Sequence, residues 1–193
     1  QINDKTVEAE QGWTILQAAQ RAGASIPVLC YGRNLPLAEA CRLCLVEVEG
    51  SPRPVAACAT PVADGMKIYT NTKEVRQARR DIVELLVDNH PEDCHTCERD
   101  GNCELQRLVY SMGIRHRHFT GERKHYEKDL SGASVIRDPD KCILCGRCVR
   151  MCSEIQGVHC LGQAYRGFNT VVMPAYNMPF AEWVCSGCGQ CIN

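Results

Sequence analysis

One closely spaced run of cysteines restricts the fold of this chain more than any other feature. Four cysteines follow one another with gaps of two, two and three residues, at Cys142, Cys145, Cys148 and Cys152. Three thiolates at this spacing can surround one cuboidal iron–sulfur cluster, and the fourth then reaches a neighbouring cluster. A zinc ion usually takes two separated pairs of ligands, and cysteines three residues apart cannot all find distant disulfide partners. The run therefore predicts iron–sulfur clusters and a protein that carries electrons.

A second, shorter run near the end of the sequence predicts a further [4Fe–4S] cluster. The two runs interlock as in bacterial two-cluster ferredoxins, so the last cysteine of the first run joins the three cysteines of the second. We number four sets of ligands in chain order, and the first two are described below. The third set is Cys142, Cys145 and Cys148, and the fourth set is Cys152, Cys185, Cys188 and Cys191. By the same spacing, the remaining ligand of the third set is expected beyond Asn193, in a longer chain of which this one is a part.

Four cysteines nearer the N-terminus form a first set, which comprises Cys30, Cys41, Cys44 and Cys58. They lie on neighbouring loops and on a predicted strand, an arrangement that suits a [2Fe–2S] cluster with two cysteines on each iron. The ten residues between the first two cysteines exceed the spacing of plant ferredoxins, so the match rests on the overall pattern. The alternative is a zinc site together with free buried thiols.

A second set combines one histidine with three cysteines, at His90, Cys94, Cys97 and Cys103. Taken alone, such a set also suits zinc. The neighbouring cluster motifs favour a [4Fe–4S] cluster with one imidazole ligand, and a neutral ligand in place of a thiolate raises the reduction potential. His95 is the competing nitrogen ligand. We prefer His90, because adjacent residues such as Cys94 and His95 rarely face one metal.

The overall composition agrees with a metal protein and excludes several other classes. The chain has 193 residues with 22 basic and 23 acidic side chains, and this balance does not indicate nucleic-acid binding. No apolar stretch of about 18 residues is present, so no membrane span is expected. Fifteen cysteines at short spacings favour a reducing compartment over a secreted disulfide scaffold, and we expect a cytoplasmic location. Glycine-rich nucleotide-binding motifs and a serine elbow are absent, which predicts no catalytic site within this chain.

Hydrophobic periodicity predicts a mixture of helices and short strands. Helices are expected over 12–21, from a capping signal at 71–74 to about 89, and over 103–111. Strands are expected over 43–48, 55–59 and 66–69. The charged segment 113–128 is predicted to be a solvated linker, with a partner-docking surface as the alternative. An insertion over 154–184 separates the two cysteine runs.

Several residues close to the ligands are expected to support the clusters. Three glycines would let backbone N–H groups approach the sulfides, at Gly146, Gly187 and Gly189. Three basic side chains either add positive charge near the clusters or are solvated surface residues, namely Lys141, Arg147 and Arg150. Cys160 remains outside all four sets and is predicted to be a buried structural thiol.

As a group, these ligands resemble those of the N-terminal iron–sulfur module of [FeFe]-hydrogenases of the electron-bifurcating or NAD(P)-linked type. The resemblance is carried by the first and second sets and by the stretches Cys142-Ile-Leu-Cys-Gly-Arg-Cys-Val-Arg-Met-Cys152 and Cys185-Ser-Gly-Cys-Gly-Gln-Cys191. The module is similar to the start of the complex I 75-kDa subunit, to the diaphorase small subunit of NAD-linked [NiFe]-hydrogenases and to NAD-dependent formate dehydrogenases. The intact second run favours the hydrogenase side, because many complex I subunits lack most of it.

The resemblance implies an α+β chain of three domains. Residues 1–72 would form a β-grasp [2Fe–2S] domain, and residues 73–133 a small helical [4Fe–4S] domain with one His and three Cys ligands, followed by a linker. Residues 134–193 would form a bacterial-type 2[4Fe–4S] ferredoxin domain that is incomplete at its C-terminal end. The expected cofactors are one [2Fe–2S] and three [4Fe–4S] clusters.

The implied function is electron transfer within a multi-subunit, NAD(P)-linked hydrogenase, with electron bifurcation as one option. Single electrons would pass between a flavin/NAD(P)-binding iron–sulfur subunit, or ferredoxin, and a hydrogen-activating subunit or domain. The same relay in a NAD-dependent formate dehydrogenase or in complex I is the close alternative. A zinc-binding scaffold is the distant one.

Overall fold

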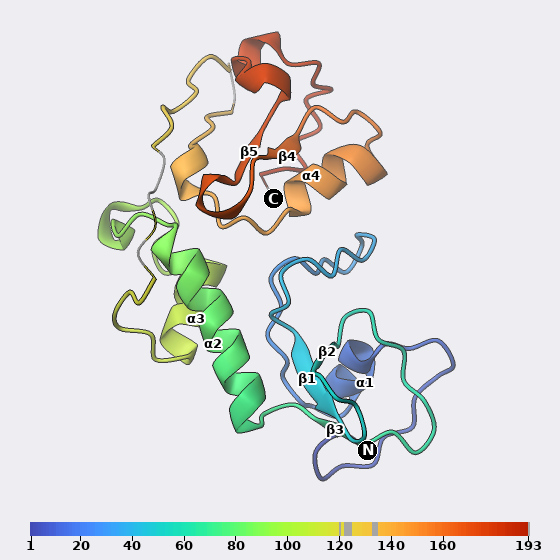
Figure 1. Ribbon diagram of the computed structural model, residues 1–193. Coiled ribbons are helices and arrows are strands. Elements are labelled where there is room, and N and C mark those ends of the chain that lie inside the picture. The colour runs from blue at the N-terminus through green and yellow to red at the C-terminus, as the bar shows by residue number, and fades with distance from the viewer. Residues whose placement is uncertain (120, 122–124, 133–134, 193) are drawn as a thin grey trace.

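Three regions with different elements follow one another along the chain (Figure 1). The computed structural model describes residues 1–119, 121, 125–132 and 135–192. In chain order its principal elements are α1 (Ile15–Arg21), β1 (Leu45–Val48), β2 (Val55–Ala56), β3 (Ile68–Tyr69), α2 (Lys73–Asp88), α3 (Glu104–Ser111), α4 (Arg147–Arg150), β4 (Gly162–Ala164) and β5 (Val171–Met173). The mixture of helices and small sheets agrees with the predicted class, while the three domain boundaries stay a prediction.

The N-terminal region packs α1 against a three-stranded antiparallel sheet. The strand order is β2-β1-β3, with Leu45 opposite Ala56 and Glu47 opposite Tyr69. The predicted helix over 12–21 begins at Ile15, because the Thr14 side chain caps it in a capping box with Gln17. Strand β1 lies within the predicted range 43–48. The core of this region is formed by buried side chains of α1 and of the sheet, including Leu16, Val46, Ala57 and Ile68.

Two helices build the middle region, and both were predicted almost to the residue. Helix α2 begins after Thr72, whose hydroxyl accepts a hydrogen bond from the Val75 backbone N–H at 3.2 Å. Helix α3 ends at Ser111, and Gly113 follows with a φ of 63°, the left-handed conformation that glycine adopts without strain. Figure 1 shows α2 running from the small sheet towards the C-terminal region, with α3 beside it.

A second apolar core joins all three regions. Its buried members are Leu29, Leu43, Val83, Leu105, Leu108 and Ile114, and the partly buried Ile143 packs against them. Leu29 and Leu43 come from the loop before β1, Val83 from α2, and Ile143 from the C-terminal region. Because each fully buried leucine contributes about 1.5–3 kcal/mol, this core holds the three regions in one arrangement.

The first part of the charged segment 113–128 is mostly exposed, as predicted, but it also makes specific contacts with the middle region. Arg117 donates from Nη2 to the carbonyl oxygen of His90 at 2.6 Å, and Nδ1 of His118 lies 2.9 Å from a carboxylate oxygen of Glu84. Glu84, on α2, is only 4% exposed. A buried carboxylate needs hydrogen-bonding partners, and Glu84 finds them in this segment and in Arg80 of its own helix. The sequence analysis did not predict these contacts, because the partners are distant in sequence.

Within the described residues, the second part of the same segment contacts the C-terminal region through Asp140. Tyr126 donates its backbone N–H to a carboxylate oxygen of Asp140 at 3.0 Å, and His125 also pairs with this carboxylate. Arg123 and Lys124, which contribute to the predicted charge of the linker, lie outside the described residues.

The C-terminal region combines α4 with a two-stranded antiparallel sheet. A π-helical turn, Met151–Ile155, follows α4 directly, and β4 pairs with β5 so that Gly162 lies opposite Met173. All three side chains of β5 are buried. The sequence analysis did not predict this hairpin, because strands of three residues carry too little periodicity. Within the described part of the chain, no helix has both the length and the apolar character needed to cross a lipid bilayer.

Candidate metal centres

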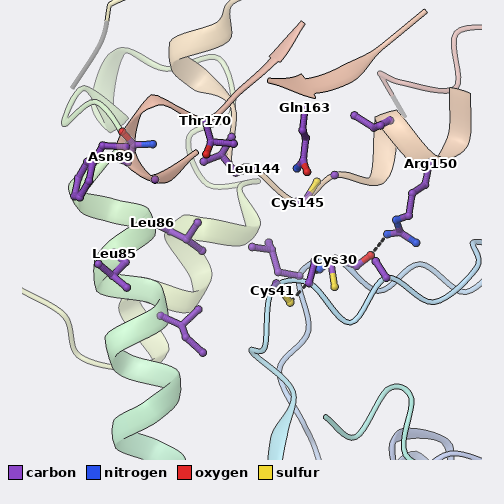
Figure 2. Close-up of a pocket in the computed structure, with 18 residues that line it drawn as sticks. Cys30, Cys41, Leu85, Leu86, Asn89, Leu144, Cys145, Arg150, Gln163 and Thr170 are labelled. Carbon is purple, nitrogen blue, oxygen red and sulfur yellow. Dashed lines mark hydrogen bonds between the residues drawn. The ribbon is translucent and has the colours of Figure 1, made fainter. Parts of the chain in front are cut away.

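The first set of cysteines is collected at the edge of the N-terminal core. Cys30, Cys44 and Cys58 are 4%, 2% and 2% exposed, and Cys41 is half-buried. Cys44 immediately precedes β1, and Cys58 follows β2 by two residues, so the pairing of these two strands brings both thiols together. Cys30 donates its backbone N–H to Sγ of Cys41 at 3.5 Å, which closes the long loop between them (Figure 2).

Within this set the thiols form two hydrogen-bonded pairs. The pKa of the Cys41 thiol is lowered to about 6, first because the Cys30 thiol donates to it and also because backbone N–H groups do. The pKa of the Cys44 thiol is lowered to about 7, chiefly by a hydrogen bond from the Cys58 thiol. The charges of Cys41 and Cys44 both act on Cys58, so the two pairs are neighbours. Two adjacent thiol pairs are what two irons with two cysteines each require.

A buried cation lies beside the first set. Arg79 on α2 is 6% exposed and donates from Nη2 to the carbonyl oxygen of Leu45 at 2.6 Å. Burial lowers the pKa of its guanidinium to about 10, while the charge of Cys44 acts in the opposite direction. The arginine therefore lies within electrostatic range of a thiolate in the first set, a contact that the sequence analysis missed.

All four members of the second set line one cavity of about 130 Å³. His90 follows the end of α2, Cys94 opens a short 3₁₀ turn, and Cys103 caps the start of α3. Apolar side chains of α3, Leu105 and Val109, form another wall. The competing candidate His95 is exposed and does not line this cavity.

The imidazole of His90 is held from the C-terminal region. Burial and the charge of Lys141 lower the pKa of His90, while a hydrogen bond to the backbone of Cys142 acts in the opposite direction. Metal-binding imidazoles commonly donate their second ring N–H to a backbone carbonyl, which fixes the orientation of the ring. The contact also connects the second set directly to the third.

The third and fourth sets share one local backbone geometry. The N–H two residues after a cysteine returns to its sulfur, from Leu144 to Cys142 and from Gly187 to Cys185, both at 3.4 Å. In each run, the second and fourth residues after this cysteine have positive φ values, at Leu144, Gly146, Gly187 and Gly189. The two loops thus turn in the same way, and each carries an N–H···S bond to a cysteine sulfur, one from Leu144 and one from Gly187. Such bonds stabilise negative charge on sulfur.

The third and fourth sets are also adjacent in space. The pKa of the Cys148 thiol is raised to about 12 by burial and then by the neighbouring thiols of Cys142, Cys145 and Cys191. Cys191 in turn is influenced by the other members of its own set, Cys185, Cys188 and Cys152. These positions place Cys191 near both sets, while the interlocked ligand assignment stays a prediction. Of the residues described, no three His, Cys, Asp or Glu side chains are arranged to hold a metal ion.

The three basic residues near the third set have specific partners. Arg147 donates from Nε to Sγ of Cys145 at 3.4 Å and pairs with Glu104 on α3. Lys141 pairs with Asp93, and so both residues tie the third set to the middle region. The side chains of Lys141 and Arg147 are 26% and 34% exposed, and Arg147 contacts the sulfur of Cys145, a predicted ligand.

Arg150 makes the corresponding connection to the N-terminal region. Its guanidinium donates to the backbone carbonyl of Cys30, as Figure 2 shows, and also to that of Pro36. Beside this contact lies a groove of about 480 Å³, with Cys30 and Cys41 on one side and Cys145 on the other. The first and third sets therefore face one groove.

Cys160 was predicted to be a buried structural thiol outside the four sets, and the structure differs in its burial and in its neighbours. It is half-buried, and its Sγ lies 3.2 Å from Sγ of Cys152, a member of the fourth set. The spacing of Cys160 gave no signal for this position, because it belongs to neither cysteine run.

Models of three protein families match successive parts of the chain. Residues 1–73 match a 2Fe-2S iron-sulfur cluster binding domain, and residues 79–118 match the NADH-ubiquinone oxidoreductase-G iron-sulfur binding region. Residues 135–153 match a 4Fe-4S binding domain. These ranges contain the first set, the second set, and the third set with Cys152.

Individual relatives match almost the whole chain. It is 47% identical over 197 residues to the NADP-reducing hydrogenase subunit HndD of Solidesulfovibrio fructosivorans, covering 99% of this chain and 34% of HndD. It is 44% identical over 171 residues to the NADH-ubiquinone oxidoreductase 75 kDa subunit of Reclinomonas americana, covering 89% and 25%. A crystal structure of the NAD⁺-reducing [NiFe]-hydrogenase in the H₂-reduced state matches with a TM-score of 0.85 and 31% identity, covering 96% of this chain and 79% of that one.

The chain belongs to the iron–sulfur module family that these three proteins share. Membership shows that this module contains both 2Fe–2S and 4Fe–4S binding domains. The donor chemistry agrees, because paired thiols, a His/Cys₃ cavity and loops with N–H···S bonds suit such clusters. The module spans about a third and a quarter of the length of the two curated relatives, HndD and the 75 kDa subunit.

Proposed function

We propose that this module relays single electrons within a multi-subunit, NAD(P)-linked hydrogenase. Two of the comparisons support the proposal. The chain is similar to an NADP-reducing hydrogenase subunit, and its fold matches the structure of a NAD⁺-reducing hydrogenase. Iron–sulfur clusters supply reversible one-electron oxidation and reduction when they are bound. The contribution of the chain is to hold them in fixed positions and to control their surroundings.

One observation supports this proposal most strongly: hydrophobic residues next to the predicted ligands belong to one shared core. Leu29 precedes Cys30, Leu43 precedes Cys44, and Ile143 follows Cys142, and all three hydrophobic side chains belong to the core that joins the regions. Because close-packed interiors deform little, such a core fixes the first, second and third sets relative to one another. An electron relay needs this property, because transfer depends on constant separations. An assembly scaffold would not require it.

Polar contacts between the sets support the same reading. The His90 ring is hydrogen-bonded to the backbone of Cys142, and Arg150 binds the carbonyl oxygen of Cys30. The first contact joins the second set to the third. The second contact joins the first set to Arg150, which lies two residues before Cys152 of the fourth set. The four sets thus form one connected group rather than four separate sites.

We propose the following cofactors and ligands. The first set holds a [2Fe–2S] cluster in a β-grasp domain, and the second set a [4Fe–4S] cluster with His90 as its nitrogen ligand. The third and fourth sets hold two [4Fe–4S] clusters in a ferredoxin-type domain, with one ligand of the third set supplied from outside residues 1–193. The partners are a flavin/NAD(P)-binding iron–sulfur subunit, or ferredoxin, and a hydrogen-activating subunit or domain.

Complex I is the second candidate, because the 75 kDa subunit of Reclinomonas americana is a relative at 44% identity. A NAD-dependent formate dehydrogenase would use the same module. The fourth set favours the hydrogenase, since its cysteines are all present and the other three act on the charge of Cys191.

Iron and acid-labile sulfide analysis of the anaerobically purified full-length protein tests the proposal. The cysteine-substituted form of each set, made in the same protein, serves as the matched control. We expect the module to contribute about 14 iron and 14 sulfide ions, the content of one [2Fe–2S] and three [4Fe–4S] clusters. Reduction by dithionite should produce EPR signals of both cluster types. A colourless module with about four zinc ions and no EPR signal would overturn the proposal in favour of a zinc scaffold.

A further inference from the structure

Cys160 lies against the fourth set although no spacing rule assigns it there. Its Sγ is 3.2 Å from Sγ of Cys152, and the Cys185 thiol interacts with it as well. The fourth set needs four thiolates for one [4Fe–4S] cluster. With Cys160, this part of the chain offers five thiols.

The position of Cys160 is built into the backbone on both sides. Gly157 and His159 have φ values of 66° and 57°, which turn the chain back onto the π-helical turn that contains Cys152. The backbone N–H groups of Val158 and His159 then donate to the carbonyl oxygen of Cys152 at 3.0 and 3.3 Å. His159 is not a glycine, so its left-handed conformation is strained and is held by these contacts.

The other side of Cys160 is fixed by the hairpin. Leu161 is buried, and β4 begins at Gly162 and pairs with the buried strand β5. Cys160 is therefore held between a turn bonded to Cys152 and a strand bonded to the sheet. A thiol on a mobile surface loop would not be restricted in this way.

The same segment is thus bonded to Cys152 in two ways. Its backbone donates to the carbonyl oxygen of Cys152, and the Cys160 sulfur lies against the Cys152 sulfur. The segment that carries Cys160 is thus organised around the ligand position of Cys152, and it presents a second sulfur at that position.

We propose that Cys160 is a second ligand-competent thiol of the fourth set, able to bind the same iron as Cys152 and to replace it there. This inference rests on the proposed iron–sulfur function of the fourth set. No electrons are exchanged in the replacement: one Fe–S(Cys) bond breaks as another forms, and the released thiolate takes up the proton that the incoming thiol loses.

Iron content and EPR spectra of the anaerobically purified full-length protein test this proposal. In Cys152→Ala we expect Cys160 to bind in place of Cys152, so the iron content stays at the wild-type level while the EPR spectrum of the fourth-set cluster shifts. In Cys152→Ala/Cys160→Ala we expect a loss of about four iron atoms per chain. Cys160→Ala alone should keep its iron.

A matched control comes from the second set. Among the described residues, the only cysteines that line its cavity are the three of that set. Cys97→Ala should lose about four iron atoms, because no further thiol lines that cavity among the described residues. The proposal is overturned if Cys152→Ala loses as much iron as the double variant. It is also overturned if mass spectrometry of the native protein finds a Cys152–Cys160 disulfide.

A second comparison remains informative if Cys152→Ala does not fold, as judged by loss of the EPR signals of the other clusters. Cys152→Ser keeps an oxygen ligand in place of sulfur. If Cys160 displaces that oxygen, the spectrum of Cys152→Ser changes when Cys160 is also replaced by alanine. Identical spectra of the single and double variants would contradict the proposal. Loss of all iron from the wild-type module would instead contradict the proposed function itself.

Discussion

The first and fourth ligand sets reach their positions by different means. Cys30, Cys44 and Cys58 are buried, and two of them belong to the N-terminal core beside α1 and the sheet. In the fourth set, Cys185, Cys188 and Cys191 are exposed, and left-handed glycines rather than packed side chains direct their loop. The first set is therefore shaped by a core that would exist without metal. The fourth set depends on loop conformation and, under the proposed function, on the cluster that it holds.

Removal of the clusters should separate the two sets most strongly. Metal binding contributes on the order of 10 kcal/mol to small metal-dependent domains, whereas a site inside a packed core has other sources of stability. After iron is chelated, we expect the amides of Leu16 and Val46 to remain protected in hydrogen exchange. The amides of residues 185–191 should exchange rapidly. Simultaneous loss of protection in both places would remove the distinction drawn above.

A core substitution should have the next largest effect, and only at the first set. Leu16 is 1% exposed in α1, so Leu16→Ala should destabilise the N-terminal region by about 2–5 kcal/mol. Native-state hydrogen exchange measures this loss, and the EPR signal of the first-set cluster should weaken with it.

Val184→Ala is the matched control beside the fourth set. Val184 is 81% exposed and immediately precedes Cys185, so its truncation should change stability by no more than about 0.5 kcal/mol. A comparable cost from both substitutions would show that the fourth set also depends on side-chain packing.

The smallest expected effect concerns the reduction potential of the first set. Arg79→Leu removes the buried positive charge beside Cys44, and the reduced cluster, which carries more negative charge, should lose more stabilisation than the oxidised one. The midpoint potential should fall by up to about 60 mV, which corresponds to a tenfold change in a one-electron equilibrium. Redox-monitored EPR provides the measurement.

Arg76 on the same helix supplies the control for this substitution. It is exposed and donates to the carbonyl oxygen of Asn71, so Arg76→Leu removes an equal charge at the solvent side of α2. Solvent screens such a charge, and the potential should stay unchanged. Equal shifts from Arg79→Leu and Arg76→Leu would show that burial does not determine the effect.

The accuracy of the sequence predictions depended on how far along the chain the interacting residues lie. The end of helix α2 was placed within a residue and its start within the capping signal 71–74, because Thr72 caps it and a regular apolar stripe follows. The four residues of the His/Cys₃ group line one cavity, and their role as ligands stays a prediction. In contrast, the contacts of Arg117 and His118 were not predicted, because nothing near them in sequence shows that α2 offers buried carboxylates.

Sequence alone determined which residues form each local unit: the cysteine loops, whose N–H···S bonds span two residues, and the capped helices, whose hydrogen bonds span four. Only the tertiary structure decided how these units face one another. It brought Arg150 to Cys30, His90 to Cys142 and Cys160 to Cys152. Residues close in sequence can form only the few hydrogen bonds that backbone geometry allows, so the sequence predicts them. Contacts between distant residues depend on a core that forms only when all three regions pack together.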